Sequence, residues 1–298
     1  MAEKQQGFKL PEIKIKYKFY EVIAPIPNVQ LKMHALSNSD LVVLSSSSAL
    51  DSTTKMTLLA NALYNACLNN KEVFNDFEFF ARHMDFDNDL AAMLIGTLVE
   101  TYGEKELLKF QYPCEQCGTE LKFSIPYSRL VSDIKVNPKE RDFSIYEKDV
   151  EVIDEEVGIK FKGVWPSIQR HIGLNSLIEQ ITKNPKVFDV LEIPELKRDS
   201  ILIHLGYLKY IKSIISLENG ATLDVDFETN KVDEEFLIKA TYAAKILGDL
   251  PTEVLGKLPE KIFPEQYGLK CEHKKKCHEC GHNNKVDAKP LLPQLLFP

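Results

Sequence analysis

Long apolar runs are missing from this 298-residue sequence. No stretch approaches the roughly 20 consecutive apolar residues that a membrane-spanning helix requires. A secretory leader is also absent, because Met1 to Gly7 is polar and no apolar stretch follows it. We therefore expect a folded protein of a reducing compartment, without a membrane partner, in which cysteines stay as thiols.

The short motifs of common enzymes are absent too. There is no glycine-rich phosphate loop, no His-Glu-x-x-His and no Gly-x-Ser-x-Gly. Asp85, Asp87 and Asp89 resemble the start of a calcium loop, but Leu90 stands where the tight turn needs glycine. A helix N-cap explains these aspartates better. The sequence therefore favours a protein that is not an enzyme and has no small-molecule substrate.

Positive charge is in deficit, since 37 Lys and Arg face 44 Asp and Glu, for a net charge of −7. This balance argues against a nucleic-acid surface over much of the chain. Leu269 to Pro298 is locally basic, with six Lys against three acidic residues. Nucleic acid is therefore not expected as a partner, although the sequence is compatible with a local basic patch.

Cysteine is the informative residue type that is present. Cys114-Glu-Gln-Cys117-Gly118 and Cys277-His-Glu-Cys280-Gly281, here called the first and second knuckles, begin 163 positions apart (277 minus 114). Each Cys-x-x-Cys has the spacing of two ligands of a tetrahedral zinc ion, and the glycine after it tolerates a positive φ. We therefore predict one closed zinc site whose ligands are Cys114, Cys117, Cys277 and Cys280. Such a site has no open position for a substrate, so the zinc would be structural.

Two alternatives to this site stay open. Cys271 and His273 precede the second knuckle and could hold an ion with Cys277 and Cys280 alone. Disulfides are the other alternative, which a reducing compartment disfavours. Cys67 stands in the apolar run Leu63 to Leu68 and is expected to be a small core residue.

The flanks of the knuckles predict short strands. Phe110 to Tyr112 and Thr119 to Ile125 flank the first knuckle, whereas Gly268 to Lys270 and Lys285 to Ala288 flank the second. This pattern is typical of a zinc ribbon divided by a long insertion. Zinc ribbons often serve nucleic-acid-binding proteins, so a zinc-ribbon nucleic-acid-binding module is the alternative function.

In the first half of the chain, apolar residues alternate with lysines from Ile13 to Phe19 and predict a strand. Polar residues at 37–40 and 52–54 predict helix starts, the second helix covering 55–68. Leu90 to Tyr102 is apolar enough to be a buried helix, which Gly103 ends.

The second half mixes strands and helices. Short strands are expected on both sides of the turn at 154–158, and a further strand at 223–227. Helices are expected from Trp165 to Lys183, from Leu196 to Leu217 and from Asp233 to Leu247. The predicted fold class is α+β, helix-rich, with two lobes linked by a split zinc-ribbon-like four-cysteine site. The expected divisions are 1–130, with the N-terminal strand, a helical lobe and the first knuckle; 131–268, an α+β insertion lobe; and 269–298, with the second knuckle and an apolar tail.

Several of these segments carry a resemblance to a known family. They are Tyr20-Glu-Val-Ile-Ala-Pro25, Phe77-Glu-Phe-Phe, the apolar helix ending at Gly103, Lys109-Phe-Gln-Tyr-Pro-Cys-Glu-Gln-Cys117, the second knuckle and Leu295-Leu-Phe297. In this order the chain resembles the baseplate hub and hub-assembly proteins of T-even-type contractile-tail bacteriophages, best over residues 10–135. The resemblance implies a non-enzymatic component or assembly factor of the tail baseplate. It would be made in the host cytoplasm, and its partners would be other phage baseplate or tail proteins.

The last eight residues are mostly large and apolar, and two prolines there bar a regular helix. Leaving such side chains in water is costly, because burying each contributes roughly 1.5 to 3 kcal/mol. The segment is therefore expected to pack against the zinc lobe of the same chain or to dock into a neighbouring baseplate subunit. The candidate docking residues are Leu291, Leu292, Leu295, Leu296 and Phe297.

Overall fold

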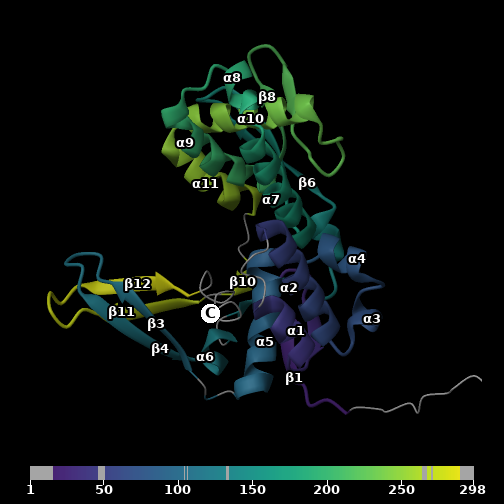
Figure 1. The fold of residues 1–298 in the computed structure, drawn as a ribbon, viewed down its shortest axis with the longest axis vertical. Coiled ribbons are helices and arrows are strands. Elements are labelled where there is room, and N and C mark those ends of the chain that lie inside the picture. The colour runs from purple at the N-terminus through teal and green to yellow at the C-terminus, as the bar shows by residue number, and fades with distance from the viewer. Residues whose placement is uncertain are drawn as a thin grey trace, which may run out of the picture.

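In a computed structural model the chain forms a lower lobe, an upper lobe and an arm that projects from the lower lobe (Figure 1). The structure describes residues 16–45, 51–103, 105, 107–131, 134–263, 267–269 and 271–288. The fold is mixed α+β with more helix than strand, as the sequence predicts. Among the described residues, no helix combines the length and the apolarity that crossing a membrane demands.

The lower lobe is built around a buried helix that packs on a β-hairpin. Helix α5 (Ala91–Tyr102) has an almost entirely apolar sequence, and it ends where Gly103 takes a φ of 92°. Val22, Leu31 and Met33 line the inner face of the hairpin beneath it. The remaining elements are β1 (Tyr20–Ala24), β2 (Val29–Met33), α1 (Asn38–Ser45), α2 (Ser52–Ala66), α3 (Asn70–Val73), α4 (Phe77–Arg82) and the π-helical turn η2 (Phe86–Leu90).

The first strand lies later in the chain than the sequence predicts. Residues 16–19 form no strand, β1 begins at Tyr20, and Ile13 and Ile15 lie outside the described residues. The reason is pairing, since the five residues of β2 match only the five residues of β1. A run with strand periodicity but no partner strand gains no ladder of hydrogen bonds.

The upper lobe is a four-stranded antiparallel sheet, in the order β6-β7-β8-β9, packed against helices. Its core joins both layers: Phe161 and Ile214 come from neighbouring strands, and Leu177, Leu205 and Leu247 come from three helices. The strands are β6 (Asp149–Asp154), β7 (Ile159–Val164), β8 (Ile211–Ser216) and β9 (Thr222–Asp224). The helices are α7 (Ile168–Lys183), α8 (Lys186–Val190), α9 (Glu195–Leu205), the 3-10 turn η4 (Gly206–Tyr210), α10 (Glu234–Asp249) and α11 (Thr252–Ile262).

The prediction of one long helix from Leu196 to Leu217 is wrong. Helix α9 stops at Leu205, and the chain continues through η4 into strand β8. Ile211 and Ile214 are buried in the sheet, where β-branched side chains pack well. Pairing with β7 therefore overrides the helical periodicity. The strand expected at 223–227 is also shorter, because β9 ends at Asp224.

Helix α7 connects the two lobes. Ile168 belongs to the core of the lower lobe and Ile172 packs against it, whereas Leu174, Leu177 and Ile181 belong to the core of the upper lobe. The helix begins at Ile168 because Ser167 caps it. Helix α7 thus contributes to the contact between the lobes.

The arm consists of two antiparallel hairpins that come from distant parts of the sequence (Figure 1). Strands β3 (Leu107–Pro113) and β4 (Glu120–Pro126) form one hairpin, and β11 (Glu272–Lys276) and β12 (Asn283–Asp287) form the other. The short elements that join arm and lobes are α6 (Tyr127–Val131), β5 (Ile134–Lys135), the 3-10 turn η3 (Phe143–Tyr146) and β10 (Gly268–Leu269), with β10 paired to β5.

Candidate metal centre

Both knuckles fold into the same turn at the ends of their hairpins. The amide of Cys114 donates to the carbonyl of Thr119 at 2.8 Å, and the amide of Cys277 donates to the carbonyl of His282 at 2.7 Å. Gly118 and Gly281 both have a φ of 75°, a conformation that glycine adopts at no steric cost. The repeated sequence motif therefore produces a repeated backbone shape.

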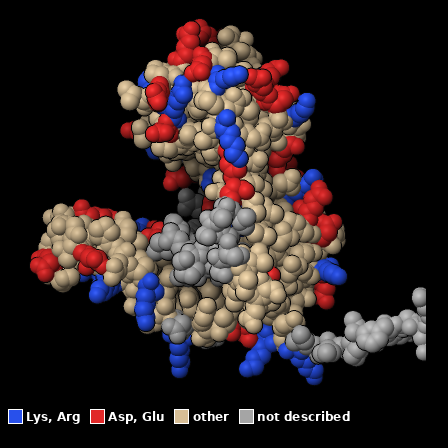
Figure 2. All heavy atoms as spheres, in the orientation of Figure 1, with Lys and Arg blue, Asp and Glu red and all other residues tan. Residues whose placement is uncertain are grey.

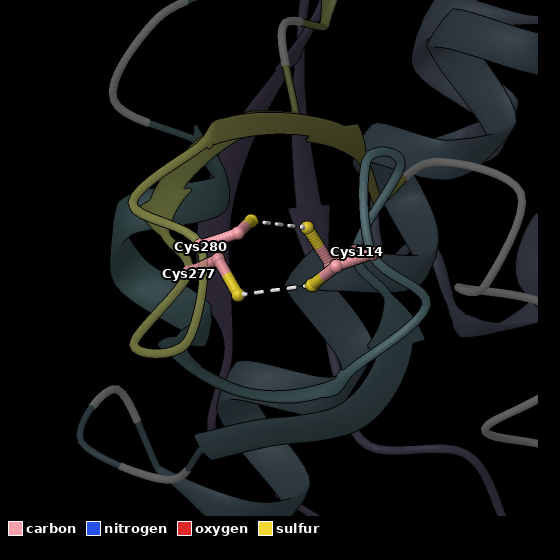
Figure 3. A group of neighbouring side chains, drawn as sticks. Cys114, Cys277 and Cys280 are labelled. Atoms are coloured by element: carbon pink, nitrogen blue, oxygen red, sulfur yellow. Dashed lines mark hydrogen bonds between the residues drawn. The ribbon is translucent and has the colours of Figure 1, made fainter.

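The two turns bring four sulfurs together at the meeting point of the hairpins (Figure 3). Cys114 Sγ lies 3.6 Å from Cys280 Sγ, and Cys117 Sγ lies 3.7 Å from Cys277 Sγ. All four sulfurs lie within 4.8 Å of one another. A disulfide would need about 2.05 Å. Zinc–sulfur bonds of about 2.3 Å in a tetrahedron separate the sulfurs by about 3.8 Å, so the donors and their spacing fit a zinc ion.

A small apolar cluster supports this site from below. Cys114 and Cys277 are buried with Leu121, Phe123 and Val286, whereas Cys117 and Cys280 lie at the surface. Two of the supporting side chains come from β4 and one comes from β12. The hairpins thus share one core that holds few residues.

The first knuckle favours thiolates. Desolvation opposes the ionisation of Cys114, but the amides of Cys117 and Gln116 and the side chain of Asn284 outweigh it and lower its pKa to about 6. The hydroxyl and amide of Thr119 lower the pKa of Cys117. Thiolates are the form that binds a metal.

Cys280 behaves in the opposite way. The amide of His282 favours its thiolate, but burial and the neighbouring thiols together raise the pKa of Cys280 to about 12. A negative charge on Cys280, added beside the thiolates of the first knuckle, needs a compensating cation, because like charges at this distance repel. The cluster is thus suited to a divalent ion.

Asn284 is a supporting residue that the sequence analysis missed. It is fully buried, and its Oδ1 accepts a 2.9 Å hydrogen bond from the amide of Glu115 in the other knuckle. Its amide group points to the carbonyls of Lys275 and His282 at 3.4 and 3.3 Å. An asparagine in a polar turn gives no signal of this role, because the partner lies 169 positions away.

The alternative ligands do not join the cluster. Cys271 lies in the core of the lower lobe, and His273 lies opposite Val286 within the β11–β12 ladder. Strand β11 separates Cys271 from Cys277, and six residues of extended chain span roughly 20 Å. Within the described part of the chain, the potential metal ligands that gather are Cys114, Cys117, Cys277 and Cys280.

The strand that leads into the second knuckle differs from the prediction. It is β11, whereas Gly268 and Leu269 form β10 and pair with β5 instead. Lys270 lies outside the described residues. The buried side chain of Cys271 anchors the chain between these two strands and sets where the hairpin begins.

The sequence predicted that the four-cysteine site links the two lobes, but the structure places this site elsewhere. It joins the two hairpins of the arm, and the arm stands apart from the upper lobe (Figure 1). The physical reason is that α7 already joins the two lobes through their apolar cores.

A buried acidic pair lies near the contact between the lobes. Asp85 caps η2, as the sequence predicts, by accepting a 2.6 Å hydrogen bond from the amide of Asn88. Asp89 accepts from the amides of Ile26 and Asp85 and from the hydroxyl of Tyr146, at 2.8 to 2.9 Å. Burial is the main cause that raises the pKa of Asp85 to about 7 and that of Asp89 to about 8. The sequence shows acidic residues here but not that they are buried.

The remaining candidate residues fall outside the structural description. Leu291, Leu292, Leu295, Leu296 and Phe297 are not among the described residues.

Two histidines lie in or beside the second knuckle. The side chain of His278 is 66% exposed, and the imidazole of His282 lies 3.6 Å from the carboxylate of Glu115. Neither histidine is in the four-sulfur cluster.

A family model described as T4 bacteriophage base plate protein matches residues 14–293. The chain belongs to this family. Comparison with curated proteins and comparison with solved structures each gave no match. Membership of the base plate family confirms the resemblance seen in the sequence, and it gives the chain a structural role in the base plate at the phage tail. Its expected partners are other phage tail proteins.

Proposed function

We propose that this chain is a non-enzymatic structural component or assembly factor of the hub region of the base plate, where it docks other tail proteins. Membership of the base plate family supports the location. The four-sulfur cluster is the observation that carries the structural role, because it closes a projecting arm instead of a cleft for chemistry. A closed site of this kind holds a surface in shape for a partner.

The second part of the proposal is that Cys114, Cys117, Cys277 and Cys280 hold one structural zinc ion. Four thiolates complete a tetrahedron and leave no position for water or substrate. The ion would add its binding free energy to the folding of the arm. Sulfur spacings of 3.6 and 3.7 Å support this assignment.

Elemental analysis of protein purified in reducing buffer without added metal tests the zinc site. We expect about one zinc per chain, as a single four-ligand site requires. Cys117→Ser and Cys280→Ser should each abolish zinc binding, although they lie in different hairpins. Cys271→Ser is the matched control and should keep the metal. Metal retained by Cys117→Ser and lost by Cys271→Ser would contradict the proposed ligand set.

A test of the base plate role starts from tail structures isolated from infected cells. We expect this chain in finished base plates or, for an assembly factor, in their precursors only. Normal base plates built in cells that lack this chain would contradict both roles. Retention on DNA at moderate salt would instead support the zinc-ribbon nucleic-acid module, since such binding rests on phosphate contacts.

The apolar segment at 291–298 remains a proposed docking element with Leu295 and Phe297 as its anchors. Deletion of residues 291–298 distinguishes docking into a neighbouring subunit from packing against the same chain. If the segment docks, the truncated chain should keep its melting temperature but fail to assemble with tail proteins. A large drop in melting temperature of the isolated protein would show that the segment completes this chain's own core.

A further inference from the structure

Large apolar side chains are exposed on the outward face of the β1–β2 hairpin, in the segment before β1 and in the segment after α2. Tyr17 is 50% exposed, Phe19 48%, Leu68 43% and Ile23 38%. The opposite face of the same hairpin is fully buried under α5. Exposed apolar groups that gather on one face mark an interaction surface more often than isolated ones do.

Contacts connect Tyr17, Phe19 and Leu68 to β2 and to the residue that follows it. The Phe19 ring lies 5.5 Å from the Lys32 amine, and the Tyr17 ring stacks on His34 at 4.3 Å. The amide of Leu68 donates to the carbonyl of Lys32 at 2.8 Å, which brings Leu68 beside the strand. We call this surface the basal patch, and it comprises Lys16, Tyr17, Lys18, Phe19, Glu21, Ile23, Lys32 and Leu68.

The basal patch is basic, because its three lysines face one acid, Glu21, which lies opposite Lys32 across the hairpin. Lys16, Lys18 and Lys32 are exposed, and in the described part of the chain no carboxylate forms an ion pair with them. Glu21 is the nearby acid on β1, and its carboxylate accepts from Gln30 at 2.9 Å. Figure 2 shows basic side chains projecting along the lower edge of the molecule, where the lower lobe lies.

We propose that the basal patch docks an acidic segment of a neighbouring base plate protein, with Tyr17 and Phe19 as its apolar anchors. Aromatic residues are enriched among the side chains that dominate binding energy, and a rim of lysines selects an acidic partner. The proposal rests on the function proposed above, because it names the kind of partner that the chain docks.

Two other occupants fit the patch less well. A second copy of this chain, placed symmetrically, would bring the same lysines face to face, and like charges oppose such contact. Nucleic acid could stack on Tyr17 and Phe19, but it would leave the aliphatic side chains of Ile23 and Leu68 uncovered, whereas an apolar side chain of a protein partner can cover them. The patch contains no arginine.

The first test places a photoreactive benzoylphenylalanine at Phe19 during phage infection. We expect an adduct with another base plate protein, and mass spectrometry should map it to an acidic segment. The control is the same substitution at Tyr242, which is 45% exposed on α10 in the upper lobe. An adduct with this same chain, an adduct with nucleic acid, or equal adducts from both positions would overturn the proposal.

The second test reverses charge in matched sets. The basal variant is Lys16→Glu with Lys18→Glu and Lys32→Glu, and the control is Lys186→Glu with Lys197→Glu and Lys257→Glu, all exposed and in the upper lobe. Both sets change the net charge equally. We expect the basal variant to reduce incorporation into base plates about tenfold or more, and the control to leave it near wild type.

The outcomes of this test separate the two proposals. If the wild-type chain neither enters base plates nor supports their assembly, the proposed function fails. If the wild type does and the basal variant does equally well, only the basal patch is wrong. If the basal variant has a lower melting temperature than the wild type, Phe19→Ala takes its place in the test. This substitution should weaken incorporation by about 30-fold, the effect of losing a binding hot spot.

Discussion

Arg170 shows how a single residue organises the upper lobe. Its side chain is 1% exposed, yet every nitrogen of its guanidinium has an acceptor. Nη1 donates to Asp226 at 2.7 Å and to Glu228 at 2.8 Å, and the guanidinium carbon lies 4.6 Å from the centre of the Phe227 ring. The other acceptors are the backbone carbonyls of Leu208, Lys209 and Ile211. One side chain thus ties α7, η4, β8 and the loop after β9 together.

We predict that Arg170→Met destabilises the protein by about 3 to 5 kcal/mol, because it leaves the buried carboxylate of Asp226 without its partner. Urea unfolding followed by circular dichroism measures this loss. Arg82→Met is the control, since Arg82 pairs with Glu78 at an exposed position, and such a pair contributes about 0 to 1 kcal/mol. Equal effects of the two substitutions would show that the Arg170 network has little energetic weight.

Asp85 and Asp89 make stability depend on pH. Their pKa values in the folded chain, about 7 and about 8, lie above the value of about 3.9 for an unfolded aspartate. The folded state therefore binds more protons, and the free energy of unfolding falls as pH rises through this range. His171 acts in the opposite direction, since burial lowers its pKa to about 4 and it favours stability as pH rises to about 6.5.

Between about pH 6.5 and pH 8 each proton that the aspartates retain should lower the free energy of unfolding by about 1 kcal/mol per pH unit. The lowered pKa of Cys114, about 6, acts in the opposite direction over the same interval, so the contribution of the aspartates is measured as a difference in slope between the wild type and Asp89→Asn. Asp89→Asn cannot release a proton and should flatten this slope, whatever its effect on absolute stability. Denaturant titrations at several pH values give the slope. Equal slopes for the wild type and Asp89→Asn between about pH 6.5 and pH 8 would contradict the prediction.

Among the elements, α7 has the widest influence because it contributes side chains to both cores. Its first turn is fixed by Ser167, which is 4% exposed and whose hydroxyl accepts from the amide of Arg170 at 3.2 Å. Ser167 also bridges to Asp85 in the lower lobe. The start of the helix is thus set at the contact between the lobes.

Ser167→Ala should lower the free energy of unfolding by about 1 kcal/mol, the usual loss for a helix N-cap. Ser176→Ala on the same helix is the control, because the Ser176 hydroxyl bonds only to Gln180 in an exposed pair. That change should stay within about 0.5 kcal/mol. Thermal unfolding of the two variants side by side makes the comparison. A control that is as destabilising as Ser167→Ala would rule out a special role for the cap.

The elements that the sequence predicted well are those with local signals. Gly103 ends α5 because only a residue tolerant of positive φ fits there, and Ser52 lies at the predicted start of α2. The stretch from Ile211 to Ser216 has helical periodicity, but it forms strand β8 because it pairs with β7. Strand β7 lies about 50 positions earlier in the sequence. Pairing over such a distance leaves no local mark.

The difference between local and long-range signals also explains which residues of the site the sequence predicted. Each knuckle is a local motif, so its two cysteines were recognisable from spacing. Asn284 and the buried pair Asp85 and Asp89 depend on contacts with residues far away in sequence, such as Glu115 and Tyr146. Sequence patterns carry no measure of burial for a single polar residue, and so these residues stayed hidden.

At the scale of the whole molecule, the cysteine cluster closes a loop that contains the entire upper lobe. The loop begins at Cys114 and ends at Cys280, and its two ends meet in the arm. The upper lobe has a large core of its own, whereas the arm has a few buried residues around the sulfurs. A two-stranded hairpin by itself is marginally stable at best. We therefore expect the arm, and not the upper lobe, to depend on the proposed zinc ion.

We expect metal removal to loosen the arm selectively. After treatment with a thiol-binding mercurial and a chelator, hydrogen exchange should accelerate in β3, β4, β11 and β12, because a structural ion contributes its binding free energy to the fold around it. Exchange in α10 and β7 should stay slow, since their contacts are apolar and distant from the sulfurs. Cys280→Ser provides the comparison, as its arm should already exchange quickly before treatment. Unchanged exchange in the arm would show that the hairpins hold together without a metal, and equal acceleration in both regions would show that the ion stabilises the whole chain.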